Sequence, residues 1–94
     1  MIFIWDNEKS RRNLAKHKVG FETALLVFDD PNAVCRRDRT SEREERWQTL
    51  GLVGGMVILL VAYTYCELGG EEVIRIISAR KATSHERKIY EQGG

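Results

Sequence analysis

The sequence predicts a small α+β domain with a mostly antiparallel sheet and with helices packed mainly on one face of that sheet. Three observations support this fold class. Two apolar, strand-like segments flank Gly54-Gly55, a pair that is typical of a hairpin turn. Apolar residues recur at helical spacing from residue 21 to residue 28. Thr83 and Glu86 have the T-x-x-E spacing of a capping box, which marks the start of a last helix.

The expected order of elements is β-α-α-β-β-β-β-α. Asp6 is typical of a helix N-cap, and Pro31 ends the second helix because the residue before a proline avoids the helical conformation. In the first helix Leu14 and Ala15 are the only clear core residues, so this helix is expected to lie on the surface and to show a basic face. The expected strands are residues 2–5, 33–36, 45–53, 56–65 and 73–80, and the expected helices are residues 7–18, 21–28 and 84–92.

The glycine pair also predicts a register for the hairpin. If the two glycines form a two-residue turn, Arg46 faces Tyr63 across the hairpin and Trp47 faces Ala62. A slip of one residue would change every one of these pairs. In either register, polar side chains gather at the end of the hairpin away from the turn.

Length and composition indicate one domain, which we expect to span residues 1–94. The apolar fraction of 43% and the charged fraction of 31% exclude a disordered chain. The longest apolar run, residues 56–62, is far shorter than the roughly 20 residues that a membrane span needs. The N-terminal residues lack the basic region and apolar core of a signal peptide, so we expect a cytoplasmic protein without membrane contact.

Charge is segregated along the chain, although the formal net charge is only +1. Residues 9–18 carry five lysines and arginines and no acid, and residues 75–88 carry five and a single glutamate. Segregated charge gives a local positive potential despite a nearly neutral total. The chain therefore keeps a nucleic-acid partner possible, although each segment taken alone also fits an ordinary solvated helix face.

Metal and cofactor sites are not indicated. Cys35 and Cys66 lie in separate expected elements without CxxC spacing, so both are expected to be unpaired, small apolar residues. Two cysteines and two distant histidines are too few for a zinc site. The chain contains no GxxxxGK, GxGxxG or HExxH motif. We therefore expect no metal and no cofactor.

His17 is a candidate general base. Lys16 and Lys18 flank it, and neighbouring cations favour the neutral imidazole that accepts a proton. A surface histidine at the end of a helix is an equally good interpretation, and the sequence does not decide between the two. His85 lies in the first turn of the last helix, and we expect it to be a plain surface residue.

Two further groups fit the needs of RNA cleavage by 2′-hydroxyl attack, which requires a base, cations around the phosphorane and an acid for the leaving oxygen. Arg46 with Tyr63 is one group, and Arg80 with Lys81 is the other. Arginine suits phosphate because it forms bidentate hydrogen bonds. If the last strand reaches Lys81, the two cations point to opposite faces, and Arg80 is the one expected to meet a phosphate.

Aromatic side chains offer a possible stacking surface for unpaired bases. The four candidates are Trp5, Trp47, Tyr63 and Tyr65, and the last three lie within the expected hairpin. For each of these rings taken alone, packing in the core is the more common role.

Three stretches of the chain resemble the BrnT family, the ribonuclease toxins of type II toxin–antitoxin systems. They cover nearly the whole chain in the order of the family, and the most specific motifs are W-D-x-x-K, K-H-x-V-x-F and I-S-A-R-x-A-T-x-x-E-R. The stretches are WDNEKSRRNLAKHKVGFETALLVFDDP (5–31), SEREERWQTLG (41–51) and IRIISARKATSHERKIYE (74–91).

The resemblance implies a RelE-like fold, metal-independent RNA cleavage that halts translation, and neutralisation by a BrnA-like antitoxin. It also implies a hetero-oligomer with that antitoxin, and contact with operator DNA only through the antitoxin. The motif positions carried onto this chain are Trp5, Asp6, Lys9, Asn13, Lys16, His17, Glu45, Arg46, Trp47, Ser78, Arg80 and Lys81. Combined with the analysis of the residues themselves, the expected catalytic residues are His17, Glu45, Arg46 and Arg80, and the expected RNA-binding residues are Lys16, Trp47, Tyr63, Arg75 and Lys81.

Two positions depart from the family pattern. Thr40 stands where many relatives have histidine, which puts full activity in doubt if that histidine takes part in the chemistry. Lys18 replaces the glycine of KHGV, which implies a different backbone or one strained position. A binding module without nuclease activity, or a subunit that serves only complex assembly, therefore stays open beside the enzyme.

Overall fold

The computed structural model describes residues 1–38 and 45–93 of the chain. Its elements are β1 (Ile2–Ile4), α1 (Asn7–His17), α2 (Phe21–Ala24), the 3-10 helix η1 (Leu25–Asp29), β2 (Val34–Arg37), β3 (Glu45–Val53), β4 (Val57–Leu68), β5 (Glu71–Lys81) and α3 (Ser84–Glu91). The position of Thr40 lies outside the described residues.

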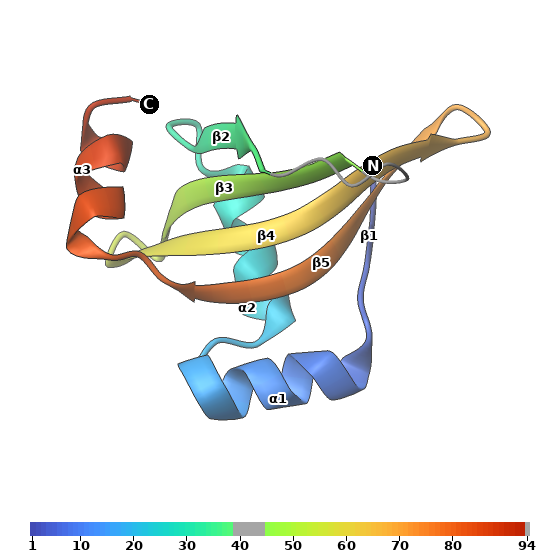
Figure 1. Ribbon diagram of the computed structural model, residues 1–94, viewed down its shortest axis with the longest axis horizontal. Coiled ribbons are helices and arrows are strands. Elements are labelled where there is room, and N and C mark those ends of the chain that lie inside the picture. Colours follow the sequence, from blue (N-terminus) through green and yellow to red (C-terminus); the bar gives the residue numbers. More distant parts are fainter. Residues whose placement is uncertain (39–44, 94) are drawn as a thin grey trace.

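A five-stranded sheet organises the fold (Figure 1). The strand order is β1-β5-β4-β3-β2, and every neighbouring pair is antiparallel except β1 and β5, which run parallel. The expected α+β class, the mostly antiparallel sheet and the order of elements are confirmed. No helix in the described part of the chain has the length and apolar character that crossing a bilayer requires.

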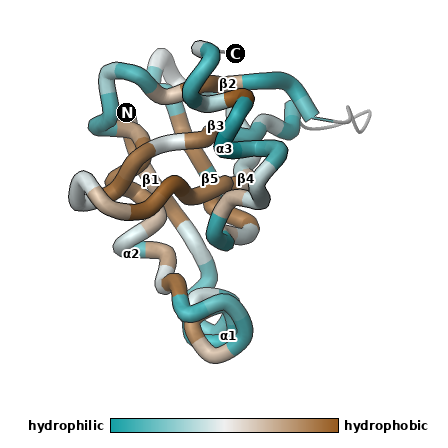
Figure 2. Tube along the Cα trace, turned by 90° about the vertical axis from the view of Figure 1, so that its left-hand side faces the viewer, coloured by the Kyte–Doolittle hydropathy of each residue, from teal (hydrophilic) through white to brown (hydrophobic). Residues whose placement is uncertain are grey.

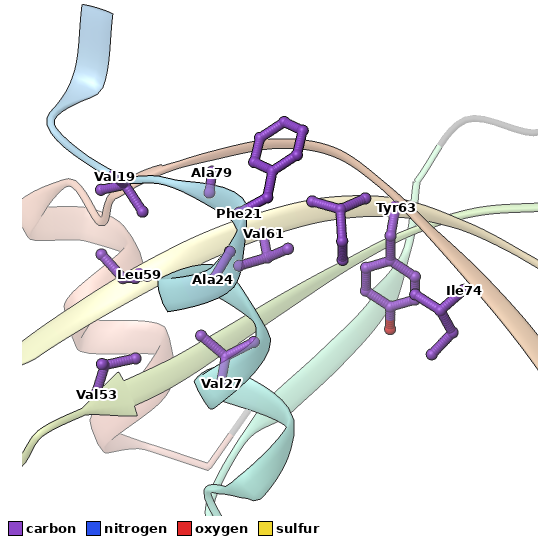
Figure 3. Close-up of a cluster of buried hydrophobic side chains, with 11 residues drawn as sticks. Val19, Phe21, Ala24, Val27, Val53, Leu59, Val61, Tyr63, Ile74 and Ala79 are labelled. Carbon is purple, nitrogen blue, oxygen red and sulfur yellow. The ribbon is translucent and has the colours of Figure 1, made fainter. Parts of the chain in front are cut away.

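The main core lies between the sheet and the segment formed by α2 and η1 (Figure 3). A smaller second core lies on the other face, where Ile89 and Tyr90 of α3 pack against Leu50 and Leu60. The first three helical segments thus share one face or edge of the sheet, and α3 covers one end of the opposite face. The buried apolar residues of the main core are Val19, Phe21, Ala24, Val27, Val53, Leu59, Val61, Tyr63, Ile74, Ile76 and Ala79.

The second helix differs from the expected single α-helix over residues 21–28. Only Phe21–Ala24 is α-helical, and the chain then continues as a 3-10 helix. The fully buried residues of α2 and η1 are Phe21, Ala24 and Val27, so every third residue of this segment faces the core. This segment presses directly on β3, because a Cβ added at Gly51 would lie 2.6 Å from the Cβ of Val27.

Asp30, at the end of η1, links this segment to β3 and to α3. One of its carboxylate oxygens, Oδ2, accepts hydrogen bonds from the backbone N–H of Leu52 in β3 and from the hydroxyl of Tyr90 in α3. The bond from Leu52 contributes most to lowering the pKa of Asp30, and the bond from Tyr90 contributes next. The acidic turn before Pro31 therefore ends the helix and also anchors α3.

Helix α1 is attached to the sheet by polar side chains, which corrects the expectation for Leu14 and Ala15. Ser10 and Asn13 are its buried residues, whereas Leu14 is 51% exposed. The side-chain N–H of Asn13 donates to the carbonyls of Val19 (2.7 Å) and Ala79 (2.8 Å), and its Oδ1 accepts from the N–H of Ala79 (3.3 Å). A hydrophobic pattern cannot reveal such a contact.

The side-chain amide of Asn13 makes the backbone hydrogen bonds to β5 that a neighbouring strand would otherwise make. Strand β1 pairs with β5 only along residues 73–75, so beyond that point no strand of the described residues lies beside this edge of β5. The amide bonds both polar groups of the Ala79 peptide on this edge. Ser10 adds a second tie, because its hydroxyl accepts from the N–H of Phe21 at 3.0 Å.

Of the two alternatives predicted for Lys18, a different backbone or one strained position, the structure confirms the strained position. It is the C-cap of α1 and has a φ of 63°, the only positive φ of a non-glycine residue in the described part of the chain. A side chain in this left-handed region costs of order 1 kcal/mol relative to glycine. The chain thus keeps the turn that a glycine favours while it carries a lysine there.

The hairpin register is shifted by one residue from the expected one. Val53 pairs with Val57, so the turn contains Met56 in addition to the two glycines. Arg46 therefore faces Thr64, and Trp47 faces Tyr63. The expected pairing of Arg46 with Tyr63 is wrong, and the two side chains point to opposite faces of the sheet because the side-chain period of a strand is two residues.

The role of Asn13 leads to a first prediction. Asn13→Ala leaves the polar groups of the Ala79 peptide and the carbonyl of Val19 without their partner, so the free energy of unfolding should fall by about 1–3 kcal/mol. Urea denaturation followed by circular dichroism measures this change. Leu14→Ala is the matched control, because Leu14 is the next residue of the same helix and is exposed. An equal or larger loss in the control would contradict the tethering role.

Candidate functional site

The sheet face that is turned away from α2 and η1 carries most of the candidate cations. Cross-strand pairing places Arg36 beside Gln48, Arg46 beside Thr64, and Arg75 beside Thr64 from the other side. Arg80 lies beside Leu60 on this same face. We call this surface the arginine face, defined by Arg36, Arg46, Gln48, Arg75, Ser78 and Arg80.

A β-bulge in β5 brings three of these side chains onto one face. Tyr63 pairs with Ile76 and Ala62 pairs with Ser78, so Ile77 is left between the two pairs. In a regular strand without a bulge, Arg75 and Ser78 would point to opposite sides, because they are three positions apart. The bulge therefore aligns Arg75, Ser78 and Arg80.

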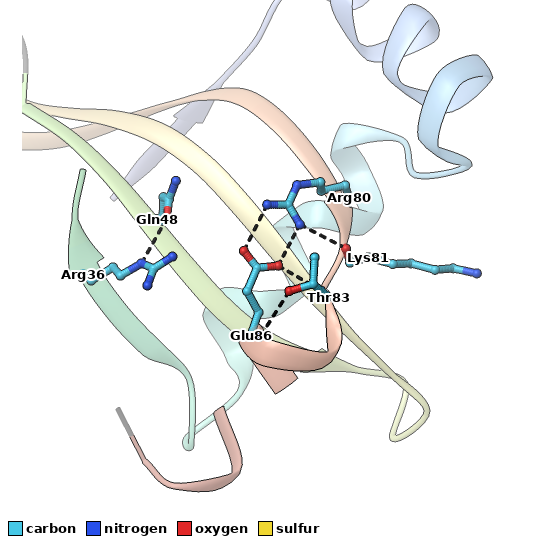
Figure 4. Close-up of polar contacts among 6 residues, drawn as sticks. All are labelled: Arg36, Gln48, Arg80, Lys81, Thr83 and Glu86. Carbon is cyan, nitrogen blue, oxygen red and sulfur yellow. Dashed lines mark hydrogen bonds and ion pairs between the residues drawn. The ribbon is translucent and has the colours of Figure 1, made fainter. Parts of the chain in front are cut away.

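Arg80 forms a bidentate ion pair with Glu86 of α3 (Figure 4). The two bonds measure 2.7 Å and 3.0 Å, and Glu86 is only 7% exposed. Glu86 also completes the capping box, since it accepts from the backbone N–H of Thr83 while its own N–H donates to the Thr83 hydroxyl. The expected box is confirmed, and its glutamate has a second task that the sequence did not indicate.

The pair shifts the ionisation of both partners. Hydrogen bonds from Arg80 hold the pKa of Glu86 at about 2, and the same bonds raise the pKa of Arg80. Both groups are therefore charged at neutral pH. The two bonds orient the guanidinium, and the Arg80 side chain remains 38% exposed.

Lys81 points away from this pair, as Figure 4 shows. Strand β5 extends to Lys81, which pairs with Leu59 on the helix-covered side, whereas Arg80 pairs with Leu60. The expectation that the two cations lie on opposite faces is confirmed. A phosphate on the arginine face can thus meet Arg80 but not Lys81.

Arg46 and Arg36 lie at the other side of the arginine face. The Nε of Arg36 donates to Oε1 of Gln48 at 3.1 Å (Figure 4). The Nε of Arg46 is buried, and within the described residues it has no hydrogen-bond partner. A buried donor without a partner is rare in folded proteins, which makes Arg46 an unusual member of the arginine face.

His17 and Lys16 belong to a groove between α1 and the part of β5 that lies beyond its pairing with β1. The groove is lined by Lys9, Arg12, Asn13, Lys16, His17, Ile77 and Ser78. Figure 2 shows α1 as a largely hydrophilic helix beside mostly hydrophobic strands. Ser78 belongs both to this groove and to the arginine face, so the two basic surfaces meet at the bulge.

Glu45, Trp47 and Tyr63 lie on the opposite face of the sheet. They line a separate pocket together with Phe28, Tyr65 and Ile74. The carboxylate of Glu45 accepts from Arg37 and from the Nε1 of Trp47, both at 3.4 Å. The predicted catalytic set is therefore split, because Glu45 is the only member that does not share the side of the arginine face or its adjoining groove.

Tyr63 is a core residue. It is 5% exposed, its hydroxyl is 2.9 Å from the hydroxyl of Thr49, and its ring packs edge-on against Phe28 with 5.1 Å between the centroids. Burial raises its pKa. Tyr63 is thus buried on the side of the sheet opposite the arginine face, so this geometry does not favour the RNA-binding role expected for it.

Comparison with known proteins identifies the family. A family model described as the ribonuclease toxin BrnT of type II toxin–antitoxin systems matches residues 5–86. The chain belongs to the BrnT family. The fold agrees with a crystal structure of the Brucella abortus ribonuclease toxin BrnT, with a TM-score of 0.61 and 24% identity over 89% of this chain and 100% of that chain. No curated protein sequence matches the chain.

Membership of the BrnT family makes this chain a ribonuclease toxin, and the type II class implies an antitoxin partner and an RNA target. The arginine face and the groove beside α1 gather His17, Lys16, Arg46, Arg75 and Arg80 on adjoining surfaces. Sequence reasoning missed Glu86 as the partner of Arg80. The T-x-x-E spacing revealed its capping role, but no spacing rule relates a strand residue to a glutamate across a turn.

The ion pair leads to a second prediction. Glu86→Gln should lower the free energy of unfolding at neutral pH by about 1–3 kcal/mol, because two charge-assisted hydrogen bonds are lost. The pKa of Glu86 is lowered from 4.5 to about 2 on folding, so its contribution is present above pH 4.5 and is lost as the pH falls toward 2. Urea titrations between pH 2 and 7 should show the two proteins converging at the acidic end. A constant difference would contradict the ionic origin.

Proposed function

We propose that this chain is a metal-independent endoribonuclease toxin that cleaves RNA in the cytoplasm and so inhibits translation. The observation that carries the proposal is the arginine face, where Arg46 holds a buried donor without a partner in the described part of the chain and Arg80 is fixed by Glu86. Oriented cations around a phosphorane stabilise its developing charge, which is the main demand of this reaction.

In the proposed reaction, a base removes the proton of a 2′-hydroxyl and the 2′ oxygen attacks the adjacent phosphorus. The bond to the 5′ oxygen breaks, and that oxygen takes a proton from water, so the products are a 2′,3′-cyclic phosphate and a 5′-hydroxyl. We assign the base to His17, because Glu45 faces the other side of the sheet. Lys16 and Arg75 would bind flanking phosphates, with Lys81 and Trp47 outside this path.

We further propose that a BrnA-like antitoxin neutralises the enzyme in a hetero-oligomer, and that operator DNA is contacted only through that antitoxin. These details rest on the type II toxin–antitoxin class to which the family belongs. They add no requirement for DNA binding by this chain itself.

One observation favours a second function, a binding module with weakened nuclease activity. Both terminal nitrogens of Arg80 are engaged by Glu86, so this guanidinium is already neutralised by a carboxylate. A phosphate must then share Arg80 with Glu86 or rely on Arg46 and Arg75. The same assay separates the two functions.

Cleavage of a labelled RNA oligonucleotide by purified, antitoxin-free protein in the presence of EDTA tests the proposal. His17→Ala should reduce the rate by about 10²–10⁴-fold as expected for a lost base. Arg46→Ala should reduce it by about 10²–10³-fold as expected for a lost charge-stabilising donor. Lys88→Ala, an exposed cation of α3, is the control and should cleave like the unmodified protein.

Folding of each variant is checked by its thermal transition in circular dichroism. A folded, antitoxin-free protein that leaves RNA intact in EDTA would count against the metal-independent enzyme. If magnesium restores cleavage, only the metal independence is wrong. If no condition supports cleavage while RNA is still bound, the binding module is the better function.

A further inference from the structure

The aromatic pocket on the helix-covered face is not used by the proposed reaction. It has a volume of about 310 Å³ and lies at the end of the sheet beyond η1. Its lining is mostly apolar, and Cys35 and Glu45 stand at its margin. The rings and apolar side chains that form it belong to Met1, Phe28, Trp47, Tyr63, Tyr65 and Ile74.

Three carboxylates stand on the same face as this pocket, at its open end. Glu67 of β4 and Glu72 of β5 are direct cross-strand partners, and Glu45 is the partner of Tyr65 in the adjacent row. The hydroxyl of Tyr65 donates to Glu72 at 2.9 Å and to Glu67 at 3.4 Å, which ties the rim to the pocket wall. The Glu72 carboxylate is the main reason why the pKa of Tyr65 rises to about 12.

The facing carboxylates are unfavourable for the isolated chain. Like charges directly opposite each other destabilise a pair of strands. Arg37 pairs with Glu45, and the amino group of Met1 pairs with Glu71. Among the ion pairs of the described residues, neither Glu67 nor Glu72 has a cationic partner. A cation from outside the chain would remove this repulsion.

We infer that this pocket and its acidic rim bind a segment of the antitoxin that inserts an aliphatic or aromatic side chain and places a lysine or arginine beside Glu67 and Glu72. Charge complementarity selects this occupant. RNA would bring phosphates against the carboxylates, and a second copy docked symmetrically would bring the same carboxylates together. The inference rests on the proposed function only in that it requires an antitoxin partner.

The pocket and the arginine face lie on opposite sides of the sheet. An antitoxin anchored in the pocket thus holds the toxin without using the side chains that we assign to RNA. Binding to antitoxin and binding to RNA should therefore respond to different substitutions, which makes the two proposals separable by experiment.

Fluorescence anisotropy of the labelled antitoxin, titrated with the full toxin chain, tests the rim. Glu67→Lys combined with Glu72→Lys should weaken binding at least tenfold, and Glu67→Gln combined with Glu72→Gln should weaken it severalfold. Glu91→Lys, an exposed acid of α3, is the matched control and should bind within twofold of the unmodified protein. Affinity unchanged by both rim variants would overturn the inference.

The glutamine pair also separates binding from folding. Removal of the facing charges should raise the thermal midpoint of the free toxin while the affinity for the antitoxin falls. A variant that binds poorly merely because it is unfolded would show a lower midpoint. A higher midpoint with full affinity would assign the two carboxylates no role in the contact and would overturn the inference.

Trp47 reports on the pocket directly when Trp5 is replaced by phenylalanine, because it is then the only tryptophan. The antitoxin should reduce acrylamide quenching of Trp47 at least twofold, and a 2′-O-methyl RNA oligonucleotide, which cannot be cleaved, should leave it unchanged. Protection by the RNA alone would make the pocket a nucleobase site and would overturn the inference.

The RNA cleavage assay distinguishes failure of this inference from failure of the proposed function. If the rim variants cleave RNA normally and still bind the antitoxin tightly, the inference is wrong and the proposed ribonuclease function stands. If the unmodified toxin does not cleave RNA, yet the rim substitutions weaken its binding to the antitoxin, the proposed ribonuclease function is wrong and the docking pocket stands.

Discussion

The hydrogen bonds between the Asn13 amide and the backbone of Ala79 hold helix α1, which carries Lys16 and His17, against strand β5. The amide bonds an edge of β5 beside which residues 1–38 and 45–93 place no strand, and it does so from a helix that buries almost no apolar surface. Because the helix is held by directional hydrogen bonds, its rotation about its own axis is fixed. That rotation decides that Lys16 and His17 face the groove toward Ser78 while Leu14 remains at the surface.

The sequence was informative where local rules determine the structure. The capping box at Thr83, the N-cap at Asp6 and the order of strands and helices all follow from short-range patterns. It failed where a single residue changes the geometry. Inclusion of Met56 in the hairpin turn moved Arg46 away from Tyr63, and the extra residue Ile77 realigned β5. Neither event leaves a signature in hydrophobic periodicity.

The candidate site was predictable as a set of residues but not as an arrangement. The cations were apparent from charge segregation and from the family motifs, whereas their division between two faces depends on register. Contacts between distant segments, such as Arg80 with Glu86 and Asn13 with Ala79, require the folded chain. The same folding gives a nearly neutral protein one arginine-rich face and one aromatic pocket with an acidic rim, so its net charge describes neither surface.

The bulge at Ile77 makes the backbone path of β5 as important as its composition. The bulge absorbs one extra residue, so Arg75 and Ser78 share a face although they are three positions apart. If Ile77 instead took a place in the ladder, the two halves of the strand would fall out of phase, and Arg75 would turn toward the core while Arg80 stayed in place. A substitution along this strand alters one side chain, whereas flattening of the bulge would change the whole surface at once. The face to which each side chain of β5 points is thus set by Ile77, which has no cross-strand partner in β4.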